Sequence, residues 1–544
     1  MKKLLFLLLP LLLSQCNTMQ KADYIVKANK IYTVDSAFST GSYMAVRDGK
    51  ILEVGDSSLL AKYSFDTLID YGDKFIYPGF YDAHAHFYYY GLELRNADLT
   101  GTKSIDEIIS RLKKHRKDFP AETWLVGRGW DQNDWEDKSF PTNEVLDKNF
   151  PDIPVVLTRI DGHAVWANTK ALDIAGITAG TKIDGGEVLL QNGKPTGVLI
   201  DKAAEYMQSF IPQPDREQQI NALLKAQENC FAVGMTSVAD AGLPLDVLLL
   251  IDSLQKAGKL KMRIYAMCSA DRKTLDYFWK NGKYKTDRLN IRSVKLYSDG
   301  ALGSRGALLL QPYSDDPGNY GLLVTPIDTL REYIHEAYEH GFQVNTHAIG
   351  DSANRLMLDL YAEVLKGKND LRWRIEHAQV INSNDFHKFA DYSIIPSVQP
   401  THATSDMYWA EQRLGPQRIK GAYAYKTLLE QNGWLALGSD FPIEDINPLL
   451  GIYAAVTRRD LSGYPKDGFM IEQALTREEA LRGFTVWAAR AAFEEKEKGS
   501  LEPGKFADFV VLDRDIMTVD ASQIPQAKVV ATYLGGESVY KKTQ

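Results

Sequence analysis

Hydrophobic and polar residues alternate at both ends of the chain, a pattern typical of half-buried β-strands. Within residues 22–73 the segments "DYIVKANKIYTVD", "YMAVRDGKILEVGD" and "TLIDYGDKF" alternate around turn signals such as Asp48-Gly49. The same texture returns within residues 498–544, in "KFADFVVLDRD" and "AKVVATYLGGESVY". We therefore expect one small β-sandwich built from both chain ends.

The middle of the chain, residues 74–497, alternates short β-branched runs with amphipathic helical segments such as "LREYIHEAYEHG". Eight runs are predicted strands: Phe75–His84, Thr236–Asp240, Arg263–Cys268, Ser293–Ser298, Gln343–His347, Arg374–His377, Ile394–Gln399 and Leu435–Asp440. Strands that alternate with helices indicate parallel βα units. The predicted fold class is therefore α/β, a (β/α)8 TIM barrel whose active site lies at the C-terminal strand ends.

A long segment, residues 88–220, separates the first predicted strand from the second. It exceeds an ordinary βα loop and contains strand and helix patterns of its own. We expect an inserted lid subdomain over the mouth of the barrel.

The first 16 residues resemble an export signal. Lys2 and Lys3 precede the apolar run Leu4–Leu13, which is too short to span a bilayer as a helix. The run ends in "LLSQC", which resembles a bacterial lipobox with Cys16 as the lipidated residue, although Gln15 departs from the usual small residue. We expect an exported protein of the cell envelope, a periplasmic or outer-membrane lipoprotein attached to the membrane through Cys16. The alternative is simple secretion.

Composition narrows the class of partner. The chain has 544 residues, 44% of them apolar, and a formal net charge of −8 with acidic and basic residues interspersed. This balance argues against a nucleic-acid partner, because proteins that bind nucleic acid usually carry a cluster of basic residues. The three cysteines are far apart and form no CxxC pair, which argues against a disulfide framework and against a zinc–thiolate site. A small-molecule substrate is the expected partner.

Metal-ligating residue types gather at the ends of the predicted barrel strands. In "YPGFYDAHAHF" two histidines are separated by one residue, so in a strand both imidazoles would project from one face. The residues at the strand ends are His84, His86, Lys295, His347, His377 and Asp440. Each has an ordinary structural interpretation by itself, as a hydrogen-bonded histidine, a turn aspartate or an edge lysine. Their coincidence at one end of the barrel favours a metal site, because imidazole and carboxylate suit zinc, iron, manganese or nickel.

Lys295 does not fit a simple ligand set, because an ammonium group cannot bind a cation. It would either stay cationic and hold a substrate carboxylate or phosphate, or lose its proton when buried. A neutral amine reacts with carbon dioxide to give a carbamate, which would be an anionic bridge between two metals.

The ordered set of motifs resembles the amidohydrolase superfamily, and within it amidohydrolase family 3, the group similar to N-substituted formamide deformylase. The matching segments are "PGFYDAHAHF", "VKLYSDGALGSRGA", "NTHAIGD", "IEHAQ", "QPTHATSD", "GSDFP" and "GSLEPGKFADFVVLD". The resemblance covers almost everything after the signal. It implies a TIM barrel beside a small β-sandwich, with a large insertion after the first strand, and it allows a homodimer.

The resemblance also implies roles for the strand-end residues. His84 and His86 would bind the more buried of one or two divalent ions, with zinc expected first, and His347 and His377 would bind the other. Lys295 would be the N6-carboxylated bridge. Asp440 would be both ligand and proton-shuttling base, with His377 beside it in catalysis. Metal-bound hydroxide would then attack a carbonyl and cleave a C–N bond of an amide, N-acyl or N-formyl substrate.

Five further residues are candidates for substrate binding, each with a structural alternative. They are His163, His402, Asp406, Arg305 and Trp130. His163 would contribute from the insertion, and His402 and Asp406 from the loop after the seventh strand. Arg305 would bind a substrate carboxylate or simply pair with an acid. Trp130 would lie near the pocket mouth or belong to a surface aromatic cluster.

Two other functions stay open on the sequence alone. The same hydroxide would attack lactones or other esters, and a retired hydrolase scaffold would serve as a ligand-binding envelope lipoprotein. A broken ligand set would favour the second alternative, but all six positions are filled. A redox metalloenzyme is disfavoured because no cofactor fingerprint accompanies the ligands.

Overall fold

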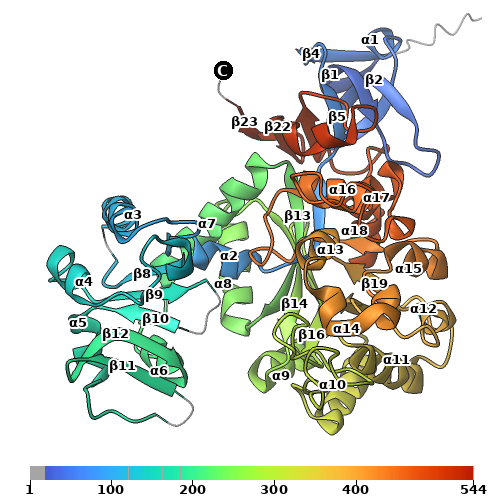
Figure 1. Ribbon diagram of the computed structural model, residues 1–544. Coiled ribbons are helices and arrows are strands. Elements are labelled where there is room, and N and C mark those ends of the chain that lie inside the picture. The colour runs from blue at the N-terminus through green and yellow to red at the C-terminus, as the bar shows by residue number, and fades with distance from the viewer. Residues whose placement is uncertain (1–18, 121, 161–163, 184–185, 543–544) are drawn as a thin grey trace, which may run out of the picture.

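The computed structural model describes residues 19–120, 122–160, 164–183 and 186–542. The predicted signal at residues 1–16, with Cys16, lies outside the described residues. Figure 1 shows three parts: a barrel, a sheet that combines both ends of the chain, and a separate lobe inserted after the first barrel strand.

The barrel is a path of eight parallel strands. In order around the path they are β6 (Phe80–Ala85), β13 (Met235–Leu243), β14 (Arg263–Ser269), β16 (Leu289–Tyr297), β17 (Gln343–Ala348), β18 (Arg374–His377), β19 (Ile395–Val398) and β20 (Ala436–Leu437). A short antiparallel strand, β15 (Tyr284–Lys285), is added to β16. Each predicted barrel strand overlaps one of the eight, so the predicted fold class is confirmed.

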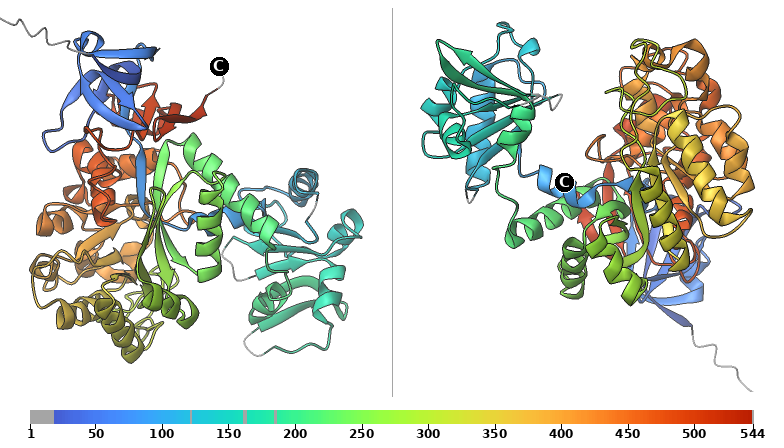
Figure 2. Two further views of the ribbon diagram at one scale, coloured as in Figure 1. Left: turned by 180° about the vertical axis from the view of Figure 1, so that it is seen from behind. Right: turned by 90° about the horizontal axis from the view of Figure 1, so that it is seen from below.

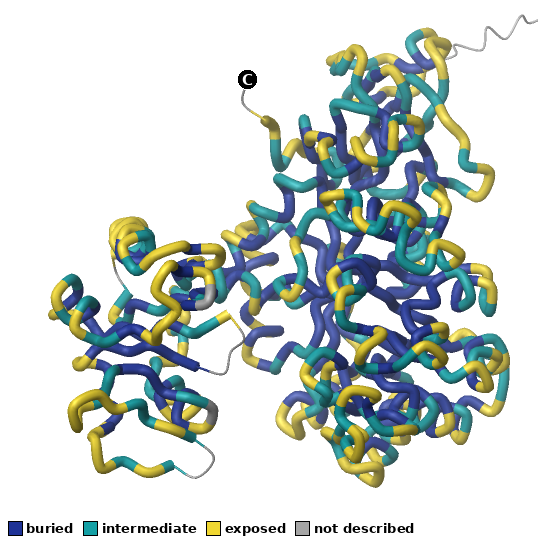
Figure 3. The backbone as a smooth tube through the Cα atoms, viewed as in Figure 1, coloured by how far each residue is buried: buried dark blue, intermediate teal, exposed yellow. Residues whose placement is uncertain are grey.

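Helices between the strands surround the barrel (Figure 1). They are α2 (Phe87–Glu93), α7 (Arg216–Ala232), α8 (Leu245–Lys256), α9 (Arg272–Asn281), α10 (Ile327–Glu339), α11 (Asp351–Leu365), α12 (Phe386–Asp391), α13 (Pro400–Asp406), α14 (Ala410–Arg418), α15 (Tyr425–Asn432), α16 (Pro448–Thr457), α17 (Arg477–Gly483) and α18 (Val486–Ala491). Their apolar faces and the strands form one large buried cluster. Figure 3 shows this buried centre beneath an exposed rim of loops.

The two ends of the strand path, β6 and β20, meet at a seam with its own hydrogen bonds. The amide of Asp440 donates to the carbonyl of His84 over 2.8 Å, and the amide of His86 donates to the carbonyl of Phe441 over 2.8 Å. The buried Asp82 carboxylate also accepts the amide of Ser439 at 3.0 Å and its hydroxyl at 2.6 Å. The seam therefore holds the histidines of β6 against the loop that carries Asp440.

The predicted strand Phe75–His84 is two strands in the structure. Residues Phe75–Pro78 form β5 of the terminal sheet, and β6 begins at Phe80. Gly79 separates them, and a Cβ added there would lie 2.3 Å from Oγ1 of Thr236. This close approach lets the chain pass from the terminal sheet directly into the barrel.

The two chain ends form one hydrogen-bonded sheet. Its strands are β1 (Gln20–Tyr32), β2 (Thr40–Arg47), β3 (Lys50–Gly55), β4 (Tyr63–Asp70), β5, β21 (Phe509–Leu512), β22 (Val529–Leu534) and β23 (Glu537–Lys541). The helical turn α1 (Leu59–Lys62) precedes β4. One buried cluster joins Met44 and Ile51 to Phe509 and Ala531, so the N-terminal and C-terminal halves share a core.

The inserted lobe has a six-stranded sheet and two hydrophobic clusters that contain only lobe residues among those described. Its elements are β7 (Ala97–Asp98), α3 (Ile105–Asp118), β8 (Leu125–Trp130), α4 (Glu144–Asn149), β9 (Val155–Arg159), β10 (Ala164–Ala167), α5 (Thr169–Ala175), β11 (Gly186–Gln191), β12 (Lys194–Asp201) and α6 (Lys202–Gln208). Figures 1 and 2 show the lobe standing beside the barrel and joined to it through α2 and α7. A Cβ on Gly91 of α2 would lie 2.3 Å from the carbonyl oxygen of Ala222 in α7, so these two helices pack tightly.

Within the described residues, the helices are all too short or too polar to cross a membrane.

The seam gives a prediction for stability. A Cβ on Gly438 would lie 2.6 Å from Oδ1 of Asp82 and 2.6 Å from the amide nitrogen of His84. We expect Gly438→Ala to lower the free energy of unfolding by about 1–3 kcal/mol, the usual cost of overpacking. Thermal unfolding measures this, with Gly180→Ala as the matched control, because the nearest atom there would be 3.9 Å away. Equal midpoints for the two variants would contradict the account of the seam.

Candidate metal centre

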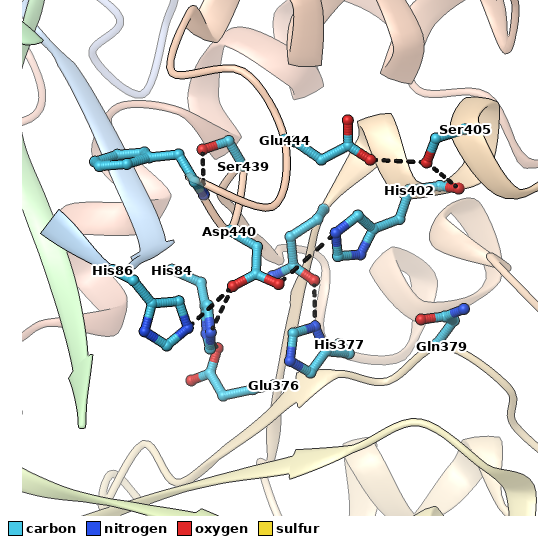
Figure 4. A network of polar contacts seen from close by, with 12 residues as sticks. His84, His86, Glu376, His377, Gln379, His402, Ser405, Ser439, Asp440 and Glu444 are labelled. Atoms are coloured by element: carbon cyan, nitrogen blue, oxygen red, sulfur yellow. Dashed lines mark hydrogen bonds and ion pairs between the residues drawn. The ribbon is translucent and has the colours of Figure 1, made fainter. Parts of the chain in front are cut away.

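The imidazoles of His84, His86, His347 and His377 and the carboxylate of Asp440 converge where the barrel strands end. Figure 4 labels all of these except His347. The rings of His84 and His377 lie 4.9 Å apart, and those of His347 and His377 lie 4.6 Å apart. Nε2 of His86 lies 3.3 Å from Oδ1 of Asp440. Residues from three strands and two strand-end loops, separated by more than 350 positions in the sequence, therefore meet in one cluster.

Glu376 sets the tautomer of His84. Its Oε2 lies 2.5 Å from Nδ1 of the fully buried His84 ring. A carboxylate only accepts, so Nδ1 donates its proton and Nε2 keeps a free lone pair. That Nε2 faces Nζ of Lys295 at 3.1 Å and Oδ1 of Asp440 at 3.4 Å, so it is directed into the cluster.

His377 is oriented in the same way by Gln399, whose Oε1 lies 2.8 Å from Nδ1 of the imidazole. The backbone of His377 has φ 73° and that of Asp440 has φ 64°, both in the left-handed region that L-residues rarely adopt. Such strain is found at functional sites. The positive φ of His377 interrupts the usual alternation of strand side chains, so that the side chains of Glu376 and His377 both reach the cluster.

Three polar atoms of the cluster are buried without a hydrogen-bond partner among the described residues: Nε2 of His347, Nε2 of His402 and Oδ1 of Asp440. Buried polar atoms are nearly always satisfied, so atoms left without a partner at one place call for a ligand. Ligand atoms of His84, His377 and Asp440 all lie within 4.8 Å of one another. This spacing allows one ion to contact all three.

The protonation states of the clustered imidazoles and of Asp440 also suit the binding of a metal cation. Burial lowers the pKa of His84 to about 4 and that of His347 to about 3, and the nearby Lys295 adds to both shifts. Burial works against ionisation of Asp440, but the close imidazole of His86 and the other imidazoles around it lower its pKa well below its usual value. At neutral pH the cluster therefore presents neutral imidazoles and an anionic carboxylate, the forms in which these groups bind metals.

Lys295 is buried at the base of the cluster, with Nζ 4.9 Å from the centroid of the Tyr297 ring. Burial lowers its pKa to about 8, although the charges of Glu376 and Asp440 favour the ammonium. An appreciable fraction of the amine is therefore unprotonated near neutral pH.

Two predicted substrate residues lie beside this centre. The ring of His402 lies 6.0 Å from that of His377, and its Nε2 lies 3.7 Å from Oδ2 of Asp440. Asp406 is farther along α13 and accepts hydrogen bonds from the Tyr423 hydroxyl at 2.8 Å and from Gln379 at 3.2 Å. His402 thus borders the metal cluster, whereas Asp406 anchors the helix that presents it.

Two of the remaining substrate candidates, Arg305 and Trp130, make other contacts. Arg305 gives Nε and Nη2 to Asp315 in its own loop, at 3.2 and 2.9 Å, which is the structural alternative. The Trp130 ring is fully buried in the lobe core, and Nε1 donates to the carbonyl of Leu157 at 2.8 Å, so its substrate role stays a prediction. His163 lies outside the described residues.

The sequence reasoning missed the residues that support the ligands: Asp82, Glu376 and Gln399. Asp82 and Glu376 did leave a signal, because each is a charged residue inside a predicted buried strand. A buried carboxylate needs hydrogen-bond donors, and here the donors belong to the chain segments that carry the metal ligands.

Comparison with known proteins places this site in a family. The model of the amidohydrolase family matches residues 67–540. The chain is 34% identical over 541 residues to "Protein LONG AFTER FAR-RED 3" of Arabidopsis thaliana, with 95% of this chain and 92% of the relative covered. It is 27% identical to N-substituted formamide deformylase of Arthrobacter pascens, with 96% and 99% covered.

A solved structure agrees with these relatives. An uncharacterized metal-dependent hydrolase from Pyrococcus horikoshii superposes with a TM-score of 0.78 and 30% identity, covering 92% of this chain and 99% of that one. The chain therefore belongs to the amidohydrolase family. It is a metal-dependent hydrolase.

The support of His84 by Glu376 can be tested through metal affinity. We expect Glu376→Gln to weaken metal binding about 10- to 100-fold, the usual effect of removing a residue that orients a ligand. Competition with a chromophoric chelator measures the affinity without reference to turnover. Glu339→Gln, an exposed change in α10, is the matched control. Equal affinities of the two variants would contradict the role of Glu376.

Proposed function

We propose that the protein hydrolyses a C–N bond of an amide, N-acyl or N-formyl compound. The observation that carries the proposal is the buried cluster of His84, His377 and Asp440, with its neutral imidazoles and its unpartnered carboxylate oxygen. The name of the Arthrobacter relative, N-substituted formamide deformylase, supports the choice of an amide substrate.

The residues that would hold the metal are His84, His86, His347, His377 and Asp440. We propose one or two zinc ions, because imidazole and carboxylate donors suit zinc, and among the described residues the ligand group contains no cysteine. A bound zinc ion supplies Lewis acidity that lowers the pKa of water to near 7 and polarises a carbonyl.

Asp440 is the proposed general base and acid. Its carboxylate stays ionised at neutral pH. Oδ1 makes no well-aligned hydrogen bond to a described residue, and its neighbours are the imidazole nitrogens of His86 at 3.3 Å and His84 at 3.4 Å, so it is placed to accept a proton from water. The oxygen of water forms the new C–O bond, the C–N bond breaks, and Asp440 returns the proton to the leaving nitrogen. His402, 3.7 Å from Oδ2 of Asp440, is placed to contact the substrate beside it.

We further propose that Lys295 is N6-carboxylated. Its pKa of about 8 leaves free amine available at neutral pH. Carbon dioxide forms a C–N bond with that amine, one proton is released, and an anionic carbamate results. The change replaces a positive charge with a negative one beside Nε2 of His84 and would add carboxylate oxygens to the ligand set.

Export to the cell envelope remains a proposal that rests on the sequence of residues 1–16.

A substrate panel tests the proposed reaction. We expect zinc-loaded protein to cleave N-formyl and N-acyl amines faster than matched lactones. Asp440→Asn should lower kcat at least about 1,000-fold, and Asp440→Glu should recover little, since proton transfer depends on position. Asp391→Asn, an exposed change at the end of α12, should have no effect. Hydrolysis of lactones alone would replace the proposal with an ester hydrolase. Binding without hydrolysis, equal in Asp440→Asn, would favour the binding lipoprotein.

A further inference from the structure

Two cavities of about 650 and 760 Å³ lie between α2 at the barrel and the inserted lobe. Both fall in the range of small-molecule binding pockets. The smaller one is lined by Tyr89, whose ring lies 6.3 Å from that of His86, so one lining residue of this cavity also stands beside a candidate metal ligand. The larger one reaches Pro442 and Ile443, in the loop that follows Asp440. A substrate at the metal centre that extended past Tyr89 would enter the space between barrel and lobe.

Two charged side chains line both cavities, Glu93 from α2 and Arg128 from β8. Arg128 is exposed, and its guanidinium has neither an ion pair nor a hydrogen bond to any described residue. The neighbouring arginines of the lobe differ in this respect. Arg95 pairs with Glu122, Arg111 with Glu107 and Arg159 with Asp131, while Arg116 donates to the carbonyl of Glu122.

The local sequence "VGRGW" explains how Arg128 is presented. Trp130 fixes the end of β8 in the lobe core. The two glycines allow close backbone packing on the buried side, since a Cβ on Gly129 would lie 2.4 Å from Oγ1 of Thr100 and one on Gly127 would lie 3.1 Å from the carbonyl of Ala97. The register of β8 against β9 shifts between Arg128 and Trp130, so Trp130 enters the core while Arg128, two residues earlier, is exposed and lines both cavities.

We propose that Arg128 binds a carboxylate on the substrate, so that the enzyme acts on N-acyl or N-formyl compounds that carry an acid group, such as N-acylated amino acids. The assignment rests on the proposed C–N hydrolysis. A guanidinium matches a carboxylate with two parallel hydrogen bonds, and one without a protein partner is free to make them. The acid-binding role that the sequence suggested for Arg305 thus passes to Arg128, because Arg305 is occupied by Asp315.

Glu93 is the group that competes with a substrate carboxylate. It is half-buried, burial raises its pKa, and the charge of Arg128 opposes that rise. The two groups are not within ion-pair distance in the structure. A different role for Arg128 would be a latch that pairs with Glu93 and holds the lobe against the barrel. The two roles predict opposite effects for the Glu93→Gln variant.

The experiment compares two formamides of the same shape, N-formylleucine and N-formylleucinamide, on the zinc-loaded full-length protein. The measured quantity is the ratio of kcat/KM for the acid to kcat/KM for the amide. We expect wild type to favour the acid. Arg128→Gln should lower the ratio about tenfold, mainly by raising KM for the acid, because the substrate carboxylate loses a hydrogen bond to a charged group. Arg128→Lys should recover part of the ratio, and Glu93→Gln should raise it. Arg216→Gln removes an exposed charge that lines neither cavity and should leave both activities unchanged.

Three outcomes would overturn the proposal. The first is a wild-type ratio of acid to amide kcat/KM near one, and the second is a ratio that Arg128→Gln leaves unchanged. The third is a lower ratio in both Glu93→Gln and Arg128→Gln, which would identify a latch. If neither formamide is cleaved, the proposed reaction fails for this substrate class. Titration calorimetry with the same two compounds then tests Arg128 separately. Tighter binding of the acid that is lost in Arg128→Gln supports the site, and equal binding of acid and amide refutes it.

Discussion

The barrel closes through a short seam between β6 and β20, and the position of the candidate ligands depends on that seam. Asp82 links the two sides by accepting the amide and hydroxyl of Ser439 and the amide of His84. The neighbouring backbone hydrogen bonds set His84 against Asp440. Histidines from the start of the barrel and a carboxylate from its last strand loop can share one ion only because the seam is closed.

Burial of this cluster decides its chemistry. Removal of water makes positive charge on the imidazoles costly, so His84 and His347 stay neutral. Burial by itself would protonate Glu376, but the adjacent Arg374 and His84 lower its pKa to about 2. The ionised Glu376 then directs the proton of His84 away from the cluster. One buried ion pair beneath the site therefore prepares a lone pair for a metal above it.

Much of the barrel could be predicted because its strands are apolar runs that end in polar ligands. Both "NTHAIGD" and "IEHAQ" place a histidine where a parallel strand ends, and topology then brings those ends together. The supporting contacts could not be predicted in this way. Which carboxylate faces His84, or which amide faces His377, depends on side-chain geometry across strands that are far apart in the sequence.

Within the lobe, Trp130 belongs to the segment "GRGWDQNDW" and fills the lobe core. The same motif contains the exposed Arg128, whose meaning appears only once the cavity and the partners of the other arginines are known. Arg305 shows the reverse case: the sequence suggests that it could bind a substrate carboxylate, but in the structure it forms an ion pair with Asp315. Ion pairing is the property that pattern reading judges least well.

The number of metal ions per chain in wild type and in Lys295→Ala, measured by inductively coupled plasma mass spectrometry after removal of free metal, is the most direct test of the metal centre. We predict one or two zinc ions in wild type, a lower count in Lys295→Ala, and partial recovery of the count and of activity with added short-chain carboxylates. Wild-type protein that retains no divalent metal would contradict the metal centre. Full occupancy and activity of Lys295→Ala without added carboxylate would contradict the role of the carboxylated lysine.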